Sequence, residues 1–297
     1  MTDQGAVFDL GYVPYEGERR GRRGALATTY RDGIARVFGV RRRARKKVLP
    51  WILLVISVLP AVVFVGFAFL LSTFAPEAES PFGGHAEYFA ITAATVFIFV
   101  ALAAPELLIP DRREGVLAIY SSRPLLPDDY VMIRSASLLT VIAIFMLAPQ
   151  VLMYIGFAAL DDAGFFSALV TNAGEIPKIL LATGVYALGY APFALLIATI
   201  TKRRGAATGT YLGVVFIGTS LAAALLEATD LPGRRFAALL AFADHPGHVS
   251  NWIFGTSGLD DNVVATAGLD PWVSLVTILA IAAVSGAVVV WRYRRLM

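Results

Sequence analysis

The sequence predicts an all-α integral membrane protein with six transmembrane helices and with both termini in the cytoplasm. Three observations support this fold: a mean hydropathy of +0.69, six long apolar segments, and Lys and Arg concentrated on one side of those segments. A soluble domain of 297 residues could not bury a chain that is 57% hydrophobic. The apolar runs are continuous rather than alternating, which favours helices over the strands of a membrane barrel.

Each apolar segment has the length that a spanning helix needs, about 20 residues for a hydrocarbon core of roughly 30 Å. The segments consist mainly of Val, Ile, Leu, Ala and Phe, with almost no charge inside them. We place the six spans near 48–72, 88–109, 135–158, 178–200, 206–227 and 271–291.

The basic residues predict the orientation of these spans. Threaded six times from a cytoplasmic N-terminus, the chain places 22 of its 25 Lys and Arg residues inside. Only Lys178, Arg234 and Arg235 fall outside. Positive residues near span ends favour the cytoplasmic face, so we expect a multi-pass protein of the cell membrane. The polar first 47 residues do not resemble a cleaved signal peptide.

The region before the first span divides into two parts. Residues 1–28 are rich in Gly, Arg and Tyr, and we expect a basic cytoplasmic tail. Residues 29–47 predict an amphipathic interfacial helix, because Tyr30, Ile34 and Val37 recur at helical spacing and Arg residues occupy other faces. The alternative is a simple basic stop before the first span. The rest of the chain, 48–297, forms the six-helix transmembrane domain.

The cytoplasmic segment 110–134 carries more signals than a loop needs. Asp111 and Glu114 have capping-box spacing, which predicts a short helix as far as Ser121. Pro124 then ends the helix before the third span begins. We expect a rigid, charged segment against which a soluble partner could push.

The outer connection at 228–270 is the longest between two spans. Phe236–Ala243 is an apolar run too short to cross a membrane, Pro246 interrupts the pattern, and Val249–Phe254 resumes it. This pattern predicts a broken, re-entrant helical hairpin between spans five and six.

Few polar groups lie within the spans, and each is a candidate site because intramembrane polarity is costly. Gln150 lies near the middle of the third span, Tyr154 follows one turn later, and Glu227 closes the fifth span. We treat these three as candidate substrate-path residues. For Gln150 a simple hydrogen bond between helices is an equal alternative.

Several chemistries are disfavoured. The chain has no cysteine and no phosphate-binding loop of the G-x-x-x-x-G-K-[ST] type. The stretch 255–258 resembles the GxSG motif of rhomboid proteases, but it lies in a polar outer loop. Asp244, His245 and His248 could approach a metal, but Pro246 lies between the histidines, so we expect no metal site.

The cytoplasmic segment resembles the connecting loop of ABC-2 type transporter permeases. In that family an acidic-basic cluster, Glu, Gly and Leu precede a Ser/Arg-Pro-Leu step and a Tyr. The six spans, the helix before them and the broken outer hairpin agree with this resemblance. The matching positions here are Asp111, Arg112, Glu114, Gly115, Leu117, Ser122, Arg123, Pro124, Leu125 and Tyr130.

The resemblance implies a permease subunit that exports a substrate, pairs with a second copy or paralogue, and contacts separate ABC ATPase subunits. ATP and Mg²⁺ would bind to the ATPase partner, so no catalytic residue or cofactor is expected in this chain, and no nucleic acid partner. The apolar spans favour an amphipathic or lipid-like substrate. The alternative is a secondary transporter or channel without an ATPase. The residues implied in ATPase coupling are Asp111, Arg112, Arg113, Glu114, Gly115, Ser122, Arg123, Pro124 and Tyr130.

Overall fold

A computed structural model describes residues 21–40, 48–75, 77–78, 82, 84–121, 125–228, 233–256 and 262–297 of the chain. All regular elements within these ranges are helices, and six are long and apolar enough to cross a membrane, which confirms the predicted class. The helices are α1 (Gly21–Val37), α2 (Val48–Phe74), α3 (His85–Arg113), α4 (Leu117–Ser121), α5 (Pro127–Ala159), α6 (Phe165–Thr171), η2 (Asn172–Gly174), α7 (Glu175–Ile200), α8 (Arg204–Ala228), η3 (Arg234–Leu240), α9 (His245–Phe254), α10 (Val263–Thr266) and α11 (Pro271–Arg294).

Helices α3, α5 and α7 form the centre of the bundle, and α2, α8 and α11 expose most of their surface. Aromatic rings fill the space between the central helices. Phe99 stacks on Phe145 with ring centroids 4.5 Å apart, and Phe89 stacks on Tyr186 at 5.6 Å. Such pairs contribute about 0.5–1.5 kcal/mol beyond the burial of their area. The space between α3, α5 and α7 is therefore filled by side chains of this chain.

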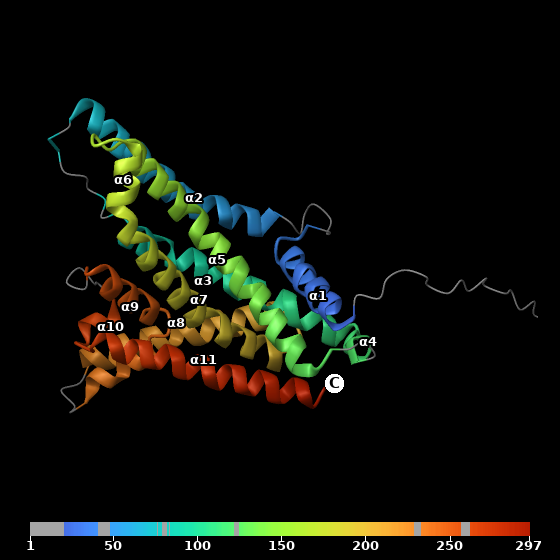
Figure 1. Cartoon of the computed structure of the whole chain (residues 1–297). Coiled ribbons are helices and arrows are strands. Elements are labelled where there is room, and N and C mark those ends of the chain that lie inside the picture. Colours follow the sequence, from blue (N-terminus) through green and yellow to red (C-terminus); the bar gives the residue numbers. More distant parts are fainter. Residues whose placement is uncertain are drawn as a thin grey trace, which may run out of the picture.

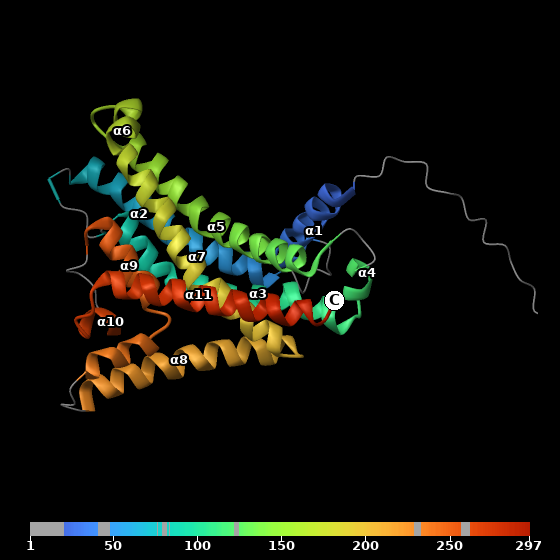
Figure 2. The ribbon, with the colours of Figure 1, turned by 60° about the horizontal axis from the view of Figure 1, so that its bottom comes forward.

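The bundle has two distinct ends (Figures 1 and 2). Helices α1 and α4 and the C-terminus lie at one end, called the α1 end below. Helices α6, α9 and α10 lie at the other end, called the α9 end. An even number of crossings returns the C-terminus to the end where α1 lies. By the distribution of Lys and Arg, the α1 end is the one expected to face the cytoplasm.

Two central helices extend well past their predicted bounds at the α1 end. Helix α3 continues to Arg113 instead of ending near residue 109, and α5 begins at Pro127 instead of near residue 135. The predicted helix over 111–121 is therefore wrong as a single element. Asp111 lies in the last turn of α3, residues 114–116 form a turn, and α4 begins at Leu117. Gly115 has a φ of 70°, which favours glycine at this break.

Helix α1 differs in bounds and packing from the predicted interfacial helix. It begins at Gly21 rather than at residue 29, and residues 41–47 of that prediction lie outside the described part of the chain. Thr29, Gly33 and Val37 are its fully buried residues, while Ile34 is half-buried against the core and the Tyr30 hydroxyl lies 2.7 Å from Thr140 Oγ1. A Cβ at Gly33 would lie 2.7 Å from Ser137 Cβ, so glycine permits α1 to approach α5 closely.

The connection between α8 and α11 forms the expected broken helical pair. The first piece is η3, and α9 follows after a short turn. Pro246 lies in the first turn of α9. Backbone N–H groups in the first turn make no hydrogen bond within the helix, so proline, which has no N–H, is well tolerated there. Proline therefore begins this helix instead of interrupting it. His245 and His248 consequently lie on one face of α9, against Ser274 of α11. This differs from the sequence-based expectation that Pro246 prevents such a helix.

Candidate functional site

A buried ionic cluster occupies the α1 end of the bundle. At its centre Arg134 of α5 and Asp111 of α3 are 0% and 1% exposed, and Nη2 lies 2.7 Å from Oδ2. Helix α1 supplies a second pair: Arg36 Nε lies 2.7 Å from Asp32 Oδ2. The two pairs are joined, because Arg36 Nη1 lies 2.5 Å from Asp111 Oδ1 and Arg134 Nη1 lies 3.1 Å from Asp32. The cluster is neutral and connects three helices.

Two tyrosines add hydrogen bonds to this cluster, in which Arg134 Nε is buried without a hydrogen-bond partner. The Tyr130 hydroxyl donates to Asp111 Oδ2 at 2.8 Å, and Arg134 Nη2 donates to the Tyr120 hydroxyl of α4 at 3.2 Å. Burial raises the pKa of the Tyr120 hydroxyl, with the Asp111 carboxylate acting in the same direction, so this side chain remains neutral. Buried charges are tolerated when they are paired and hydrogen-bonded in this way.

Further polar contacts connect the same end of the bundle. Arg112 donates to the carbonyls of Ala198 and Thr199 and, at 2.9 Å, to the Thr201 carbonyl. These carbonyls end α7, where a cation is favoured by the helix dipole. Peripheral ion pairs join Arg22 to Asp129, Arg204 to Glu106 and Arg294 to Asp128.

The predicted coupling residues divide into a buried group and an exposed group. Asp111 and Tyr130 are buried inside the ionic cluster, so they cannot contact a soluble partner directly. Arg113, Glu114 and Gly115 are exposed at the turn between α3 and α4. Ser122, Arg123 and Pro124 lie outside the described residues. The structure thus presents one exposed surface, the α3–α4 turn, directly beside the buried cluster.

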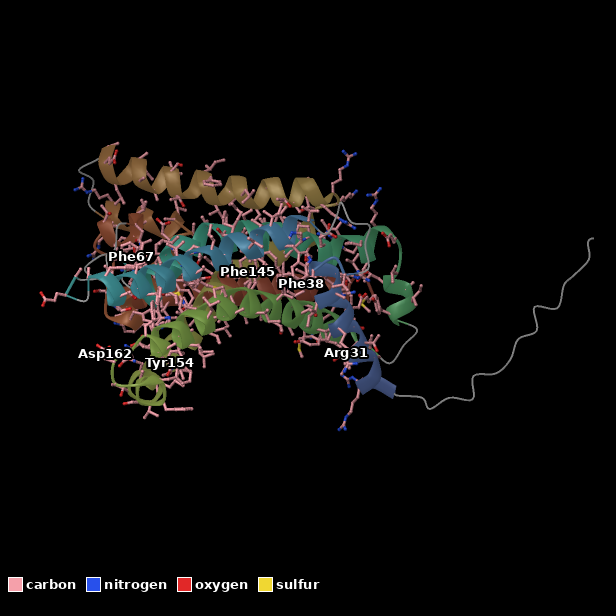
Figure 3. All side chains as sticks on the ribbon, turned by 90° about the horizontal axis from the view of Figure 1, so that it is seen from above. Arg31, Phe38, Phe67, Phe145, Tyr154 and Asp162 are labelled. Carbon is pink, nitrogen blue, oxygen red and sulfur yellow. The ribbon has the colours of Figure 1, made fainter. Side chains whose placement is uncertain are left out.

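Gln150 and Tyr154, predicted near the middle of the third span, contact elements at the α9 end of the bundle. Gln150 Oε1 pairs with Nδ1 of His85, the first residue of α3, and its Nε2 donates to the His85 carbonyl at 3.3 Å. The Tyr154 hydroxyl donates to the Leu169 carbonyl of α6 at 2.5 Å. Figure 3 shows Tyr154 between Phe145 and Asp162, away from Arg31 at the opposite end. These contacts of Gln150 agree with the alternative interpretation, a hydrogen bond between two helices.

A pocket of about 370 Å³ with a mixed polar and apolar lining opens beside these residues. His85 and Tyr154 line it, but Glu227 does not; that residue is exposed near the end of α8. Sequence reasoning missed two charged residues of this pocket, Glu175 and Lys178. The signal was present, because Lys178 is one of three basic residues predicted on the outer side.

Two buried histidines of α9 share one serine of α11. His245 Nδ1 and His248 Nδ1 lie 2.9 Å and 3.0 Å from Ser274 Oγ. His245 Nε2 lies 3.3 Å from the Leu239 carbonyl, so this nitrogen is the donor and Nδ1 accepts from the serine. Burial lowers the pKa of His245 to about 4. Among the described residues, no group of three potential ligands could hold a metal ion.

No protein-family model matches the chain, and no curated protein matches it. The structure itself defines the class of the protein. Six helices are long and apolar enough to span a membrane, so the chain is a multi-pass helical membrane protein.

Proposed function

We propose that this chain is the permease subunit of an ATP-driven transporter of the ABC-2 type in the cell membrane. One observation carries the proposal: the exposed turn that follows the central helix α3 is anchored by a buried ionic cluster that also includes α1 and α5. A connecting loop requires only a short polar turn. Here Asp111 and Arg134 place paired charges at the base of that turn, in direct contact with Arg36 and Tyr130.

The contacts suggest how a partner could act on the bundle. An ATPase that binds the α3–α4 turn would push on the end of α3. Asp111 would transfer that displacement to α5 and α1, and Arg112 would transfer it to the end of α7. Because α3, α5 and α7 are the central helices, such a displacement would change the middle of the bundle. Transport then requires different substrate affinity in the two conformations.

The proposed permease performs no bond chemistry itself. ATP and Mg²⁺ would be held by the ATPase subunits, and the chain would pair with a second copy or a related permease. The exposed apolar faces of α2, α8 and α11 are suited to lipid or to such a partner. The apolar spans support export of an amphipathic or lipid-like molecule rather than a multiply charged ion.

An ATPase is expected to co-purify with the chain. The tagged chain would be purified from its native membrane in a mild detergent, and co-purifying proteins would be identified by mass spectrometry. We expect an ATPase with a phosphate-binding loop in fixed stoichiometry. Transport by the chain alone in liposomes, with no ATPase in the native preparation, would contradict the proposal and favour a secondary transporter or channel.

Glu114→Ala is expected to reduce coupling without unfolding the protein. Glu114 is exposed on the α3–α4 turn, and an exposed charge contributes only about 0–1 kcal/mol to stability. In the reconstituted complex, substrate-stimulated ATP hydrolysis should fall severalfold, while the substrate concentration at half-maximal stimulation stays nearly unchanged. Lys202→Ala, an exposed charge in another connection, is the control. Normal stimulation in Glu114→Ala would remove the turn from the coupling surface.

A further inference from the structure

The pocket at the α9 end combines charged and aromatic walls drawn from four parts of the chain. The start of α3, the end of α5, the α6–α7 region and the end of α9 all contribute. Its volume of about 370 Å³ lies within the range of small-molecule sites. The groups that determine its chemistry are His85, Tyr154, Phe157, Glu175, Lys178 and Phe254.

Two opposite charges lie side by side in this pocket. Lys178 Nζ lies 2.7 Å from Glu175 Oε1, and the two side chains are 38% and 31% exposed. An ammonium group has three donors and a carboxylate has about four acceptor sites. Both groups therefore keep free hydrogen-bonding capacity while paired. A ligand with both charges can bind beside them without separating the pair.

Aromatic rings form the neighbouring wall. His85 is held by Gln150, and its ring centroid lies 6.0 Å from Phe157 and 6.4 Å from Tyr154. Phe254 lines the pocket from α9. Aromatic faces attract an alkylammonium cation, and they do so more strongly when water is partly excluded. The carboxylate of Glu175 would add a charge contact to the same cation.

We propose that this pocket binds the zwitterionic headgroup of an amphiphile. Lys178 would contact the phosphate or carboxylate of the headgroup, and Glu175 with the aromatic wall would contact its ammonium group. The net charge of the Glu175–Lys178 pair is zero, which disfavours ligands that carry charge of only one sign. The pocket lies near the start of the span His85–Arg113 and the end of the span Pro127–Ala159, so we place it near the depth where lipid headgroups meet water.

This binding does not depend on an ATPase, so its failure is separable from failure of the proposed function. The chain alone would be purified in an uncharged maltoside detergent. Binding of a short-chain phosphatidylcholine and of a phosphatidylglycerol with the same acyl chains would be titrated by native mass spectrometry. Wild-type chain should bind the zwitterionic lipid roughly tenfold more tightly, the scale of one charge-assisted contact.

Two charge variants give a pattern that general damage would not produce. Lys178→Gln should weaken the binding of both lipids roughly tenfold, because both carry the phosphate. Glu175→Gln should weaken the binding of phosphatidylcholine only, because only that lipid carries the ammonium group. Lys202→Gln, which removes an exposed cation from the connection before α8, should change neither affinity.

Free phosphocholine distinguishes the source of the ligand. Competition at millimolar concentration would show that the headgroup is sufficient, so that soluble zwitterions also bind. Absence of competition, with the same charge pattern for the lipids, would assign the site to membrane lipid. Wild-type affinities in both charge variants, or equal losses for both lipids in both variants, would overturn the proposal.

Discussion

Arg134→Met is expected to lower the free energy of unfolding by about 3–5 kcal/mol, the range found when one partner of a buried ion pair is removed. Arg134 is completely buried and contacts two carboxylates, those of Asp111 and Asp32. Methionine keeps most of the side-chain volume, so the loss reports charge rather than a cavity. Denaturant unfolding in detergent micelles, followed by circular dichroism, measures this change.

A double-mutant cycle separates the ion pair from general damage. In Asp111→Asn/Arg134→Met the buried pair is gone, while Arg36 and Asp32 still neutralise one another. The double variant should therefore lose less stability than the sum of the two single variants, with a coupling of about 0.5–3 kcal/mol. Arg113→Met is the control, because Arg113 is exposed at the same end of α3 as Asp111. Equal stabilities of Arg113→Met and Arg134→Met would show that the cluster does not stabilise the bundle.

Acidification is expected to destabilise the α9 end through His245. Burial lowers the pKa of His245 to about 4, below the ordinary value of about 6.5, so the unfolded chain takes up a proton first. The stability contribution is therefore complete above pH 6.5 and is lost as pH falls toward 4. This shift corresponds to roughly 3 kcal/mol. Hydrogen exchange of α9 amides over this pH range, corrected for intrinsic rates, measures the loss.

His245→Asn provides the matched control for this pH dependence. The asparagine amide can still accept a hydrogen bond from Ser274 in place of Nδ1, but it does not titrate. The other ionisable groups remain and cancel in the comparison. The variant should lose less protection than wild type between pH 6.5 and pH 4. Parallel curves for the two proteins would mean that His245 is not the group that responds.

The six spans could be predicted because apolar length is a local property of the sequence. The extensions of α3 and α5 could not. Asp111 and Arg134 are charged, and composition therefore places them outside a span, yet each provides the partner that allows the other to be buried. Their pairing joins positions 23 residues apart in sequence, and hydropathy carries no information about such contacts.

The same limit applies to the contacts of the candidate site residues. Capping-box spacing at Asp111 and Glu114 is a local signal, but the Asp111 carboxylate is taken by Arg36, Arg134 and Tyr130 from other helices. Gln150 lies near the middle of an apolar run, whereas the offset between α5 and α3 places it level with His85. Helix offsets depend on tertiary packing. Local patterns therefore identified polar residues correctly but did not predict their partners.

Asp111 and Arg112 are consecutive residues, and their side chains contact different neighbours of α3. Successive side chains on an α-helix point about 100° apart, since a turn takes 3.6 residues. Asp111 is held by α1 and α5, whereas Arg112 is held by the last carbonyls of α7. Rotation of α3 about its own axis would break one of these attachments. The end of α3 is therefore held against rotation relative to α1, α5 and α7.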